Sequence, residues 1–141
     1  MLFRSNAVGW DLARLGQLSQ ALESCQQALE HARQAGGINL EGIVWDSLGY
    51  IRHQLGQHAQ AITCYQNALQ MTRHSGEKYQ QARTLQGLGD TWHSSGALHA
   101  GRRAWREALA ILRDLGHHDA AQIQAKLAST PAPEPMVGLQ K

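Results

Sequence analysis

The residues best suited to chemistry in this sequence are its eight histidines and two cysteines, which could bind a metal ion or act as catalytic groups. Their spacing does not match such a site. No HExxH segment occurs, and no pair of histidines four residues apart has a cysteine or carboxylate on the same helix face as a third ligand. We therefore predict no metal site, and we interpret His117 and His118 as exposed residues of a turn.

The two cysteines, Cys25 and Cys64, also lack the surroundings of a reactive site. They have no CxxC spacing, and no base is placed near them to activate a nucleophile. The sequence contains no GxxxxGKS or GxxxxGKT loop, no GxGxxG fingerprint and no GxSxG turn. This pattern favours a protein that is not an enzyme and uses no cofactor, with reduced thiols as in the cytoplasm.

A basic cluster could contact the phosphates of a nucleic acid. Its members are Arg102, Arg103, Arg106 and Arg113. Acidic residues interleave with them, the formal net charge is only +2, and no helix-turn-helix motif with clear boundaries is present. A solvated outer helix face is the favoured interpretation, so we expect no direct nucleic acid binding. The sequence has neither a signal peptide nor a run of about 18 apolar residues, which predicts a cytoplasmic protein without a membrane segment.

The elements that position these residues repeat along the chain with a period of forty. Glycine recurs in three sets, and alanine and leucine in one set each. The sets are Gly9, Gly49 and Gly89; Gly16, Gly56 and Gly96; Gly36, Gly76 and Gly116; Ala28, Ala68 and Ala108; Leu29, Leu69 and Leu109. Such self-similarity predicts three repeats, at about residues 1–37, 38–77 and 78–116.

Each repeat is predicted to be a pair of helices. Apolar residues follow helical spacing, as Ala61, Tyr65 and Leu69 do, and glycine interrupts the pattern in the middle and at the end of each unit. The predicted first helices are 2–15, 39–54 and 79–95, and the second helices are 18–35, 58–75 and 98–115. A capping helix at 119–128, with Asp119 as its N-cap, completes an all-α domain of residues 1–128. Residues 129–141 contain all three prolines and are predicted to form a flexible tail.

These repeats resemble the tetratricopeptide motif, W-x2-L-G-x2-Y followed by A-x3-F. In the second repeat the matching residues are Trp45, Leu48, Gly49, Ala61, Tyr65 and Ala68; in the third they are Leu85, Leu88, Gly89, Trp92, Gly101, Trp105 and Ala108. The first repeat matches more weakly, with Cys25 at the aromatic position. The resemblance implies a right-handed superhelix, an α-solenoid of three helix-turn-helix repeats with a capping helix, which binds proteins or peptides.

A narrower resemblance covers about residues 5–128. Segments such as WDSLGYIRHQLGQHAQAITCYQNAL are similar to the C-terminal tetratricopeptide region of the actinobacterial antibiotic regulatory proteins (SARP), which activate transcription. This implies a regulatory or sensor region of a larger regulator, which docks against other domains of its own chain or against a partner. The first repeat lacks counterparts of Asn39 and Leu40, which also favours a piece of a longer chain. A free-standing scaffold or adaptor without a role in transcription is the alternative, and self-association stays open.

In tetratricopeptide proteins the first helix of each repeat lines the concave surface. The ligand-facing positions carried over to this chain are Asn6, Trp10, Arg14, Asp46, Tyr50, His53, Gln54, Arg83, Gln86, Asp90 and His93. Most of them are polar or aromatic, which suits an extended peptide or a partner helix. For Trp10 and Tyr50, packing between repeats is an equally supported alternative.

Overall fold

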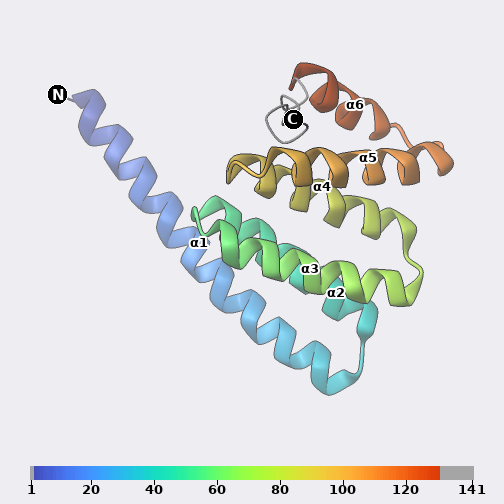
Figure 1. The fold of residues 1–141 in the computed structure, drawn as a ribbon. Coiled ribbons are helices and arrows are strands. Elements are labelled where there is room, and N and C mark those ends of the chain that lie inside the picture. Colours follow the sequence, from blue (N-terminus) through green and yellow to red (C-terminus); the bar gives the residue numbers. More distant parts are fainter. Residues whose placement is uncertain (1, 131–141) are drawn as a thin grey trace, which may run out of the picture.

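The computed structural model describes the backbone of residues 2–130 and the side chains of residues 14–130. Within this part the chain forms helices joined by short turns (Figure 1). The helices are α1 (Leu2–Ala35), α2 (Ile38–Gln54), α3 (His58–Ser75), α4 (Lys78–Ser94), α5 (Leu98–Asp114) and α6 (Ala120–Ser129). The predicted all-α class is confirmed, and the helices predicted for the second and third repeats agree with α2 to α5 to within one residue at each end.

The helices form a solenoid in which each one packs mainly on its neighbours in sequence. Every helix contacts the next one along the chain, and α2 also contacts α4, which is the first helix of the following repeat. In Figure 1, α2 to α5 lie side by side and α6 follows on the far side of α5, whereas the first half of α1 extends away from them. Contacts between neighbouring units are what hold a repeat array together.

Glycine produces the turns of the second and third repeats. Gly56 and Gly96, each between the two helices of a repeat, have φ values of +79° and +94°, in the left-handed region where a side chain is unfavourable. Gly76 closes the second repeat at φ +78°, and its N–H donates to the carbonyl of Thr72 at 3.0 Å. The interpretation of these glycines as helix breakers is confirmed.

The predicted break at Gly16 is wrong. The backbone continues through Gly16 as one helix of 34 residues, Leu2–Ala35, so the first repeat does not contain the two predicted helices, 2–15 and 18–35. A glycine inside a helix costs only about 1 kcal/mol, and a turn forms where two helices pack closely enough to offset the loss of helical hydrogen bonds. In the second repeat Tyr65 packs against Gly49 across such a turn. The first repeat has the smaller Cys25 at the equivalent position.

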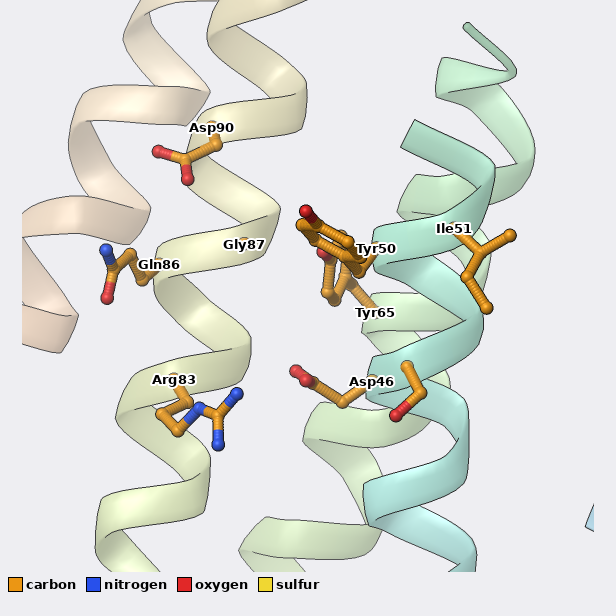
Figure 2. Close-up of a pocket in the computed structure, with 9 residues that line it drawn as sticks. Asp46, Tyr50, Ile51, Tyr65, Arg83, Gln86, Gly87 and Asp90 are labelled. Atoms are coloured by element: carbon orange, nitrogen blue, oxygen red, sulfur yellow. The ribbon is translucent and has the colours of Figure 1, made fainter. Parts of the chain in front are cut away.

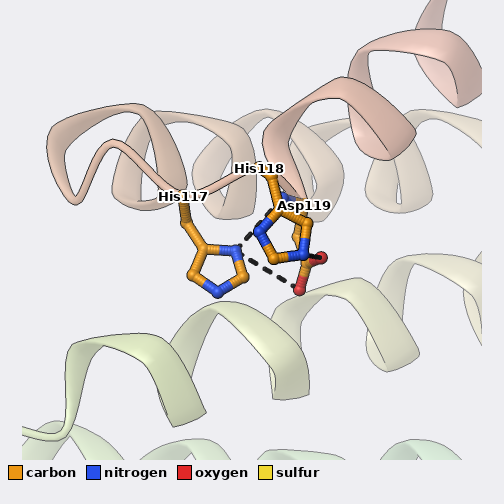
Figure 3. Close-up of side chains that lie close together, drawn as sticks. All are labelled: His117, His118 and Asp119. Carbon is orange, nitrogen blue, oxygen red and sulfur yellow. Dashed lines mark hydrogen bonds and ion pairs between the residues drawn. The ribbon is translucent and has the colours of Figure 1, made fainter.

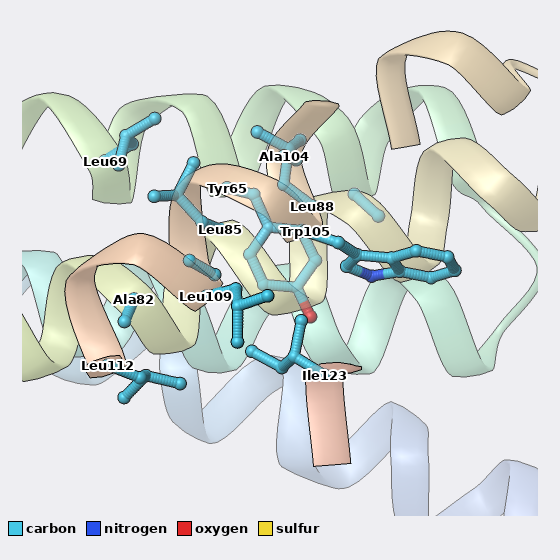
Figure 4. Close-up of a cluster of buried hydrophobic side chains, with 12 residues drawn as sticks. Tyr65, Leu69, Ala82, Leu85, Leu88, Ala104, Trp105, Leu109, Leu112 and Ile123 are labelled. Carbon is cyan, nitrogen blue, oxygen red and sulfur yellow. The ribbon is translucent and has the colours of Figure 1, made fainter. Parts of the chain in front are cut away.

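The core is built around aromatic residues that pack on glycines. Tyr65 of α3 and Trp105 of α5 are 4% and 3% exposed, and their rings lie against Gly49 and Gly89 of the preceding helices. Leucines of α3, α4 and α5, alanines of the same helices and Ile123 of α6 complete this cluster (Figure 4). None of the helices in residues 2–130 has the length and apolar composition needed to cross a membrane.

Helix α6 packs on α5 and closes the apolar core. Ile123 is fully buried, and Arg102 of α5 donates to the carbonyls of Leu127 and Thr130 at the end of α6. Asp119 takes the N-cap position, but its side chain makes no capping hydrogen bond, so the predicted capping contact is absent. The reason is that its carboxylate accepts a hydrogen bond from Tyr79 of α4 at 3.0 Å. Residues 131–141, most of the predicted tail, lie outside the described part of the chain.

Candidate binding groove

A hollow of about 440 Å³ lies between α2 and α4, with α3 at its base (Figure 2). We call it the α2–α4 groove. Its lining residues are Asp46, Ser47, Tyr50 and Ile51 of α2, Tyr65 of α3, and Arg83, Gln86, Gly87 and Asp90 of α4. The volume is within the range of roughly 300–1,000 Å³ that is typical of ligand pockets.

Two hydrogen bonds set the register between the walls of the groove. Thr84 of α4 donates to Asp46 Oδ1 of α2 at 2.9 Å. About two helical turns further along both helices, His53 Nδ1 lies 2.7 Å from Thr91 Oγ1. Both threonines are fully buried. The Thr91 hydroxyl already donates to the carbonyl of Gly87, so His53 Nδ1 is the donor in the second bond. These bonds hold α2 beside α4 with their polar faces turned to the same hollow.

The base of the groove is the ring of Tyr65, which is held between two glycines. A Cβ atom on Gly49 of α2 would lie 2.8 Å from the ring, and one on Gly87 of α4 would lie 2.7 Å from the hydroxyl oxygen. Only glycine leaves room for the ring on both sides. Tyr65 therefore enters the space between α2 and α4 and places its hydroxyl at the inner end of the groove.

Tyr50 lies at the mouth of the groove and not in the core. Its side chain is 57% exposed, and Figure 2 shows its ring beside the hollow, close to Tyr65. Of the two alternatives for Tyr50, packing between repeats is thus wrong, because more than half of the residue's surface is exposed. The side chain of Trp10, for which the same question was open, lies outside the described side chains.

The two carboxylates of the groove differ in their partners. Burial raises the pKa of Asp46, and the hydrogen bond from Thr84 and the charge of Arg83 oppose this shift. Asp90 is tied to α6 and α5, since Lys126 Nζ lies 2.9 and 3.1 Å from its two oxygens and Trp105 Nε1 donates to Oδ1 at 3.0 Å. Burial, followed by these two carboxylates, raises the pKa of Tyr65 above its ordinary value, so its hydroxyl stays protonated.

The groove brings together five of the predicted site residues. They are Asp46, Tyr50, Arg83, Gln86 and Asp90. The other described ones do not line it: Arg14 of α1 donates to Gln54 of α2, His53 bonds to Thr91, and the ring of His93 lies against that of Trp105 with ring centres 5.3 Å apart. The side chains of Asn6 and Trp10 are outside the described part.

Sequence reasoning missed four lining residues, of which Tyr65 matters most. The motif assigns Tyr65 to core packing, and it is indeed buried, but its hydroxyl also reaches the groove. The pairing of a tyrosine with the unusual Gly87, which stands outside the sets of recurring glycines, was the signal that could have shown this.

A second hollow, of about 530 Å³, lies between α3 and α5 over α4. Its floor is apolar, with Leu69, Leu88 and Trp92, and an ion pair between Arg73 and Glu107, 2.8 Å long, crosses its edge. All the polar residues that line this hollow are exposed. It is therefore less suited than the α2–α4 groove to bind one ligand selectively.

The turn before α6 holds a cluster of two histidines and a carboxylate (Figure 3). His117 Nδ1 and His118 Nε2 lie 3.5 and 3.3 Å from the oxygens of Asp119, and all three ligand atoms fall within 4.8 Å of one another. The backbone N–H of Asp119 donates to His117 Nδ1, and Tyr79 donates to the Asp119 carboxylate, so these groups partner each other. The prediction of exposure holds for His118, at 87%, whereas the His117 side chain is only 30% exposed.

Comparison with known proteins gives one result that bears on this geometry. The pattern that defines the family described as tetratricopeptide repeat matches residues 40–114, which is more than half of the chain. This stretch contains every residue that lines the α2–α4 groove. No curated protein matches the chain.

Proposed function

The chain belongs to the tetratricopeptide repeat family, and from this premise we propose that its α2–α4 groove binds an extended segment or a helix of another protein. Repeats of this family are interaction modules, and solenoids bind along their concave surface. The observation that supports the proposal best is Tyr50, an aromatic side chain 57% exposed above a hollow with polar groups at its base. Tyrosine in such a position offers flat apolar area together with a hydroxyl.

We extend the proposed binding face beyond the groove, along the first helices of the repeats. Arg14 of α1, Gln54 of α2 and His93 of α4 carry hydrogen-bonding groups outside the hollow, and Asn6 and Trp10 belong to α1 by their position in the sequence. The whole domain, proposed as residues 1–128, would then hold a partner segment longer than the groove itself. No catalytic role, no cofactor and no direct nucleic acid contact are part of this proposal.

In its wider context, the module is proposed to be the regulatory or sensor region of a larger bacterial transcription regulator of the SARP type. This proposal is supported by the resemblance of residues 5–128, approximately, to the amino-acid sequence of the C-terminal tetratricopeptide region of those regulators. The partner segment would then come from another domain of the same parent chain or from a second protein in the cytoplasm. A free-standing scaffold is the second candidate, and it uses the same groove.

The first experiment tests the groove itself. Peptides selected by display against the full chain are measured by isothermal titration calorimetry with the wild type, with Tyr50→Ala and with Leu115→Ala. Leu115 is a matched control, since it is 49% exposed and lies away from the groove. Tyr50→Ala should weaken binding by at least about tenfold, as expected for a central aromatic contact, without changing the melting temperature. Equal affinity of all three proteins would overturn the groove assignment.

A second experiment separates the two contexts. An antibody against this segment is used to measure the mass of the native polypeptide in its source cells. A product several times larger than 15.5 kDa is the result expected for the regulator. A product of about this mass would favour the free-standing scaffold.

A further inference from the structure

The Tyr65 side chain is buried, but its hydroxyl is accessible from the α2–α4 groove and has no hydrogen-bond partner among the described residues. The side chain is only 4% exposed, yet none of the hydrogen bonds formed by the described residues involves its hydroxyl, which lies at the inner end of the α2–α4 groove. A hydroxyl that no side chain or backbone group of the protein uses, at the inner end of a hollow, is available to a ligand that enters it.

The third repeat provides an internal comparison. Trp105 is the equivalent of Tyr65, forty residues later, and its Nε1 donates to Asp90 at 3.0 Å. The equivalent of Asp90 in the second repeat is Tyr50, which turns outward to the mouth of the groove. The same structural position is therefore internally satisfied in one repeat and left open to a ligand in the other.

The groups around the open hydroxyl favour a ligand that donates hydrogen bonds and carries positive charge. Asp46 lies on the α2 side and Asp90 on the α4 side, and among the described residues Asp46 forms no ion pair. Lys126 compensates Asp90 from outside the groove. Arg83 also lines the groove and its charge acts on Asp46, but its side chain is exposed and forms no ion pair with Asp46, so a basic ligand group that displaces it has the Asp46 and Tyr65 oxygens as acceptors.

We propose that the inner end of the α2–α4 groove binds a basic side chain, lysine or arginine, of the partner segment. This rests on the proposed function and names the chemistry that the groove selects. The ammonium or guanidinium group donates to Asp46 and to the Tyr65 hydroxyl oxygen, two acceptors at the inner end of the groove. The aliphatic stem of the basic residue packs on the exposed ring of Tyr50, which also attracts the cation.

The test uses four synthetic nonapeptide pools, each degenerate at all positions except the central one, which is lysine, arginine, norleucine or glutamate. The pools are passed over the immobilised full chain, and the retained peptide is quantified by mass spectrometry. The lysine and arginine pools should be retained at least about tenfold more than the norleucine pool, as a charge-assisted hydrogen bond in a shielded site implies.

Three variants locate the effect. Asp46→Asn and Tyr65→Phe should each reduce the preference for basic pools to about that for norleucine, while Asp114→Asn, an exposed carboxylate away from the groove, should keep it. Tyr65→Phe keeps the ring between its glycines, and an unchanged or higher melting temperature distinguishes a ligand contact from a structural one.

The failures can be told apart. Retention of all four pools to the same extent would leave the peptide-binding function in place and overturn the proposed preference. Retention of the glutamate pool, abolished by Arg83→Gln, would overturn it in favour of an acidic residue. If no pool is retained and display yields no ligand, the binding function itself falls, and this inference with it.

Discussion

At the scale of single residues, the groove depends on the absence of a side chain at Gly87. A methyl group there would lie 2.6 Å from two ring carbons of Tyr65, closer than side-chain contacts allow. The ring has little room to move toward α2, because it packs so closely on Gly49 that even a Cβ atom there would lie 2.8 Å from it. An absent side chain on α4 is thus the condition for a tyrosine at the base of the groove.

Gly87→Ala is expected to destabilise the chain by about 1–3 kcal/mol, as overpacking of a tight site does. It should also reduce peptide binding, because Tyr65 must move into the groove or push α4 away. Urea unfolding followed by circular dichroism gives the first quantity, and titration calorimetry with a selected peptide gives the second. A variant as stable as the wild type would show that the ring is not held in this way.

At the scale of the helices, α1 differs from its counterparts at one glycine. Gly16 and Gly56 are equivalent in the repeat, but Gly16 lies within a continuous helix, and no described atom beyond the backbone of that helix comes within 4 Å of a Cβ placed on it. Gly56, by contrast, is in a turn at φ +79°. Glycine is therefore needed for the backbone conformation at position 56, whereas at position 16 a residue with a side chain would also fit the helix.

This difference predicts opposite signs for one substitution. Gly16→Ala should stabilise the chain by about 0.5–1 kcal/mol, the gain from replacing glycine by alanine in a helix. Gly56→Ala should destabilise it by about 1–2 kcal/mol, the cost of a left-handed conformation for an L-residue. Both are measured by urea unfolding. Destabilisation by Gly16→Ala would indicate that the first repeat contains a turn after all.

The contact between α2 and α4 also predicts a dependence on pH. Burial lowers the pKa of His53, the charge of His58 lowers it further, and Asp90 opposes both. Because the unfolded chain takes up this proton near pH 6.5 and the folded chain only at lower pH, stability due to the neutral imidazole is present above pH 6.5 and is lost as the pH falls below it.

The measurement is the melting temperature at pH 7.5 and at pH 5.5 for the wild type and His53→Gln, which can still donate to Thr91. The loss of stability at the lower pH should be smaller in the variant. The other histidines are identical in the two proteins, so their contribution cancels in the comparison. An unchanged pH dependence in His53→Gln would assign the effect to other groups.

At the scale of the whole molecule, α6 completes the structure at its C-terminal end. Its Ile123 is fully buried in the cluster built on Trp105, and its Lys126 pairs with Asp90 of the groove at 2.9 Å. The last helix therefore closes the core and fixes one wall of the groove at the same time.

Ile123→Ala should lower the free energy of unfolding by about 2–5 kcal/mol, as truncation of a buried isoleucine does. Neighbouring units of a solenoid stabilise each other, so the loss should reach α4 and α5 and lower the single unfolding midpoint. Gln124→Ala, exposed on the same helix, is the control, and it should change the free energy of unfolding by no more than about 0.5 kcal/mol. Equal midpoints for both variants would show that α6 is not docked.

The sequence by itself determined the helices of the second and third repeats, the turns at Gly56, Gly76 and Gly96, and the face on which Asp46, Tyr50 and Asp90 lie. These features follow from local rules: helical spacing of apolar residues, glycine in left-handed turns and a fixed period. Each rule acts over a few residues and repeats three times, so the pattern is visible without any knowledge of distant contacts.

Only the tertiary structure decided the continuity of α1 through Gly16, the second role of Tyr65 and the attachment of Asp90 to Lys126. Each depends on residues that are far apart in sequence, as the pairs Tyr65–Gly87 and Asp90–Lys126 are. Whether a glycine turns the chain, or a buried hydroxyl finds a partner, is settled by what the neighbouring helix presents at that point. The period of the sequence predicts that such neighbours exist, but the depth and direction of each side chain follow from how closely the helices pack.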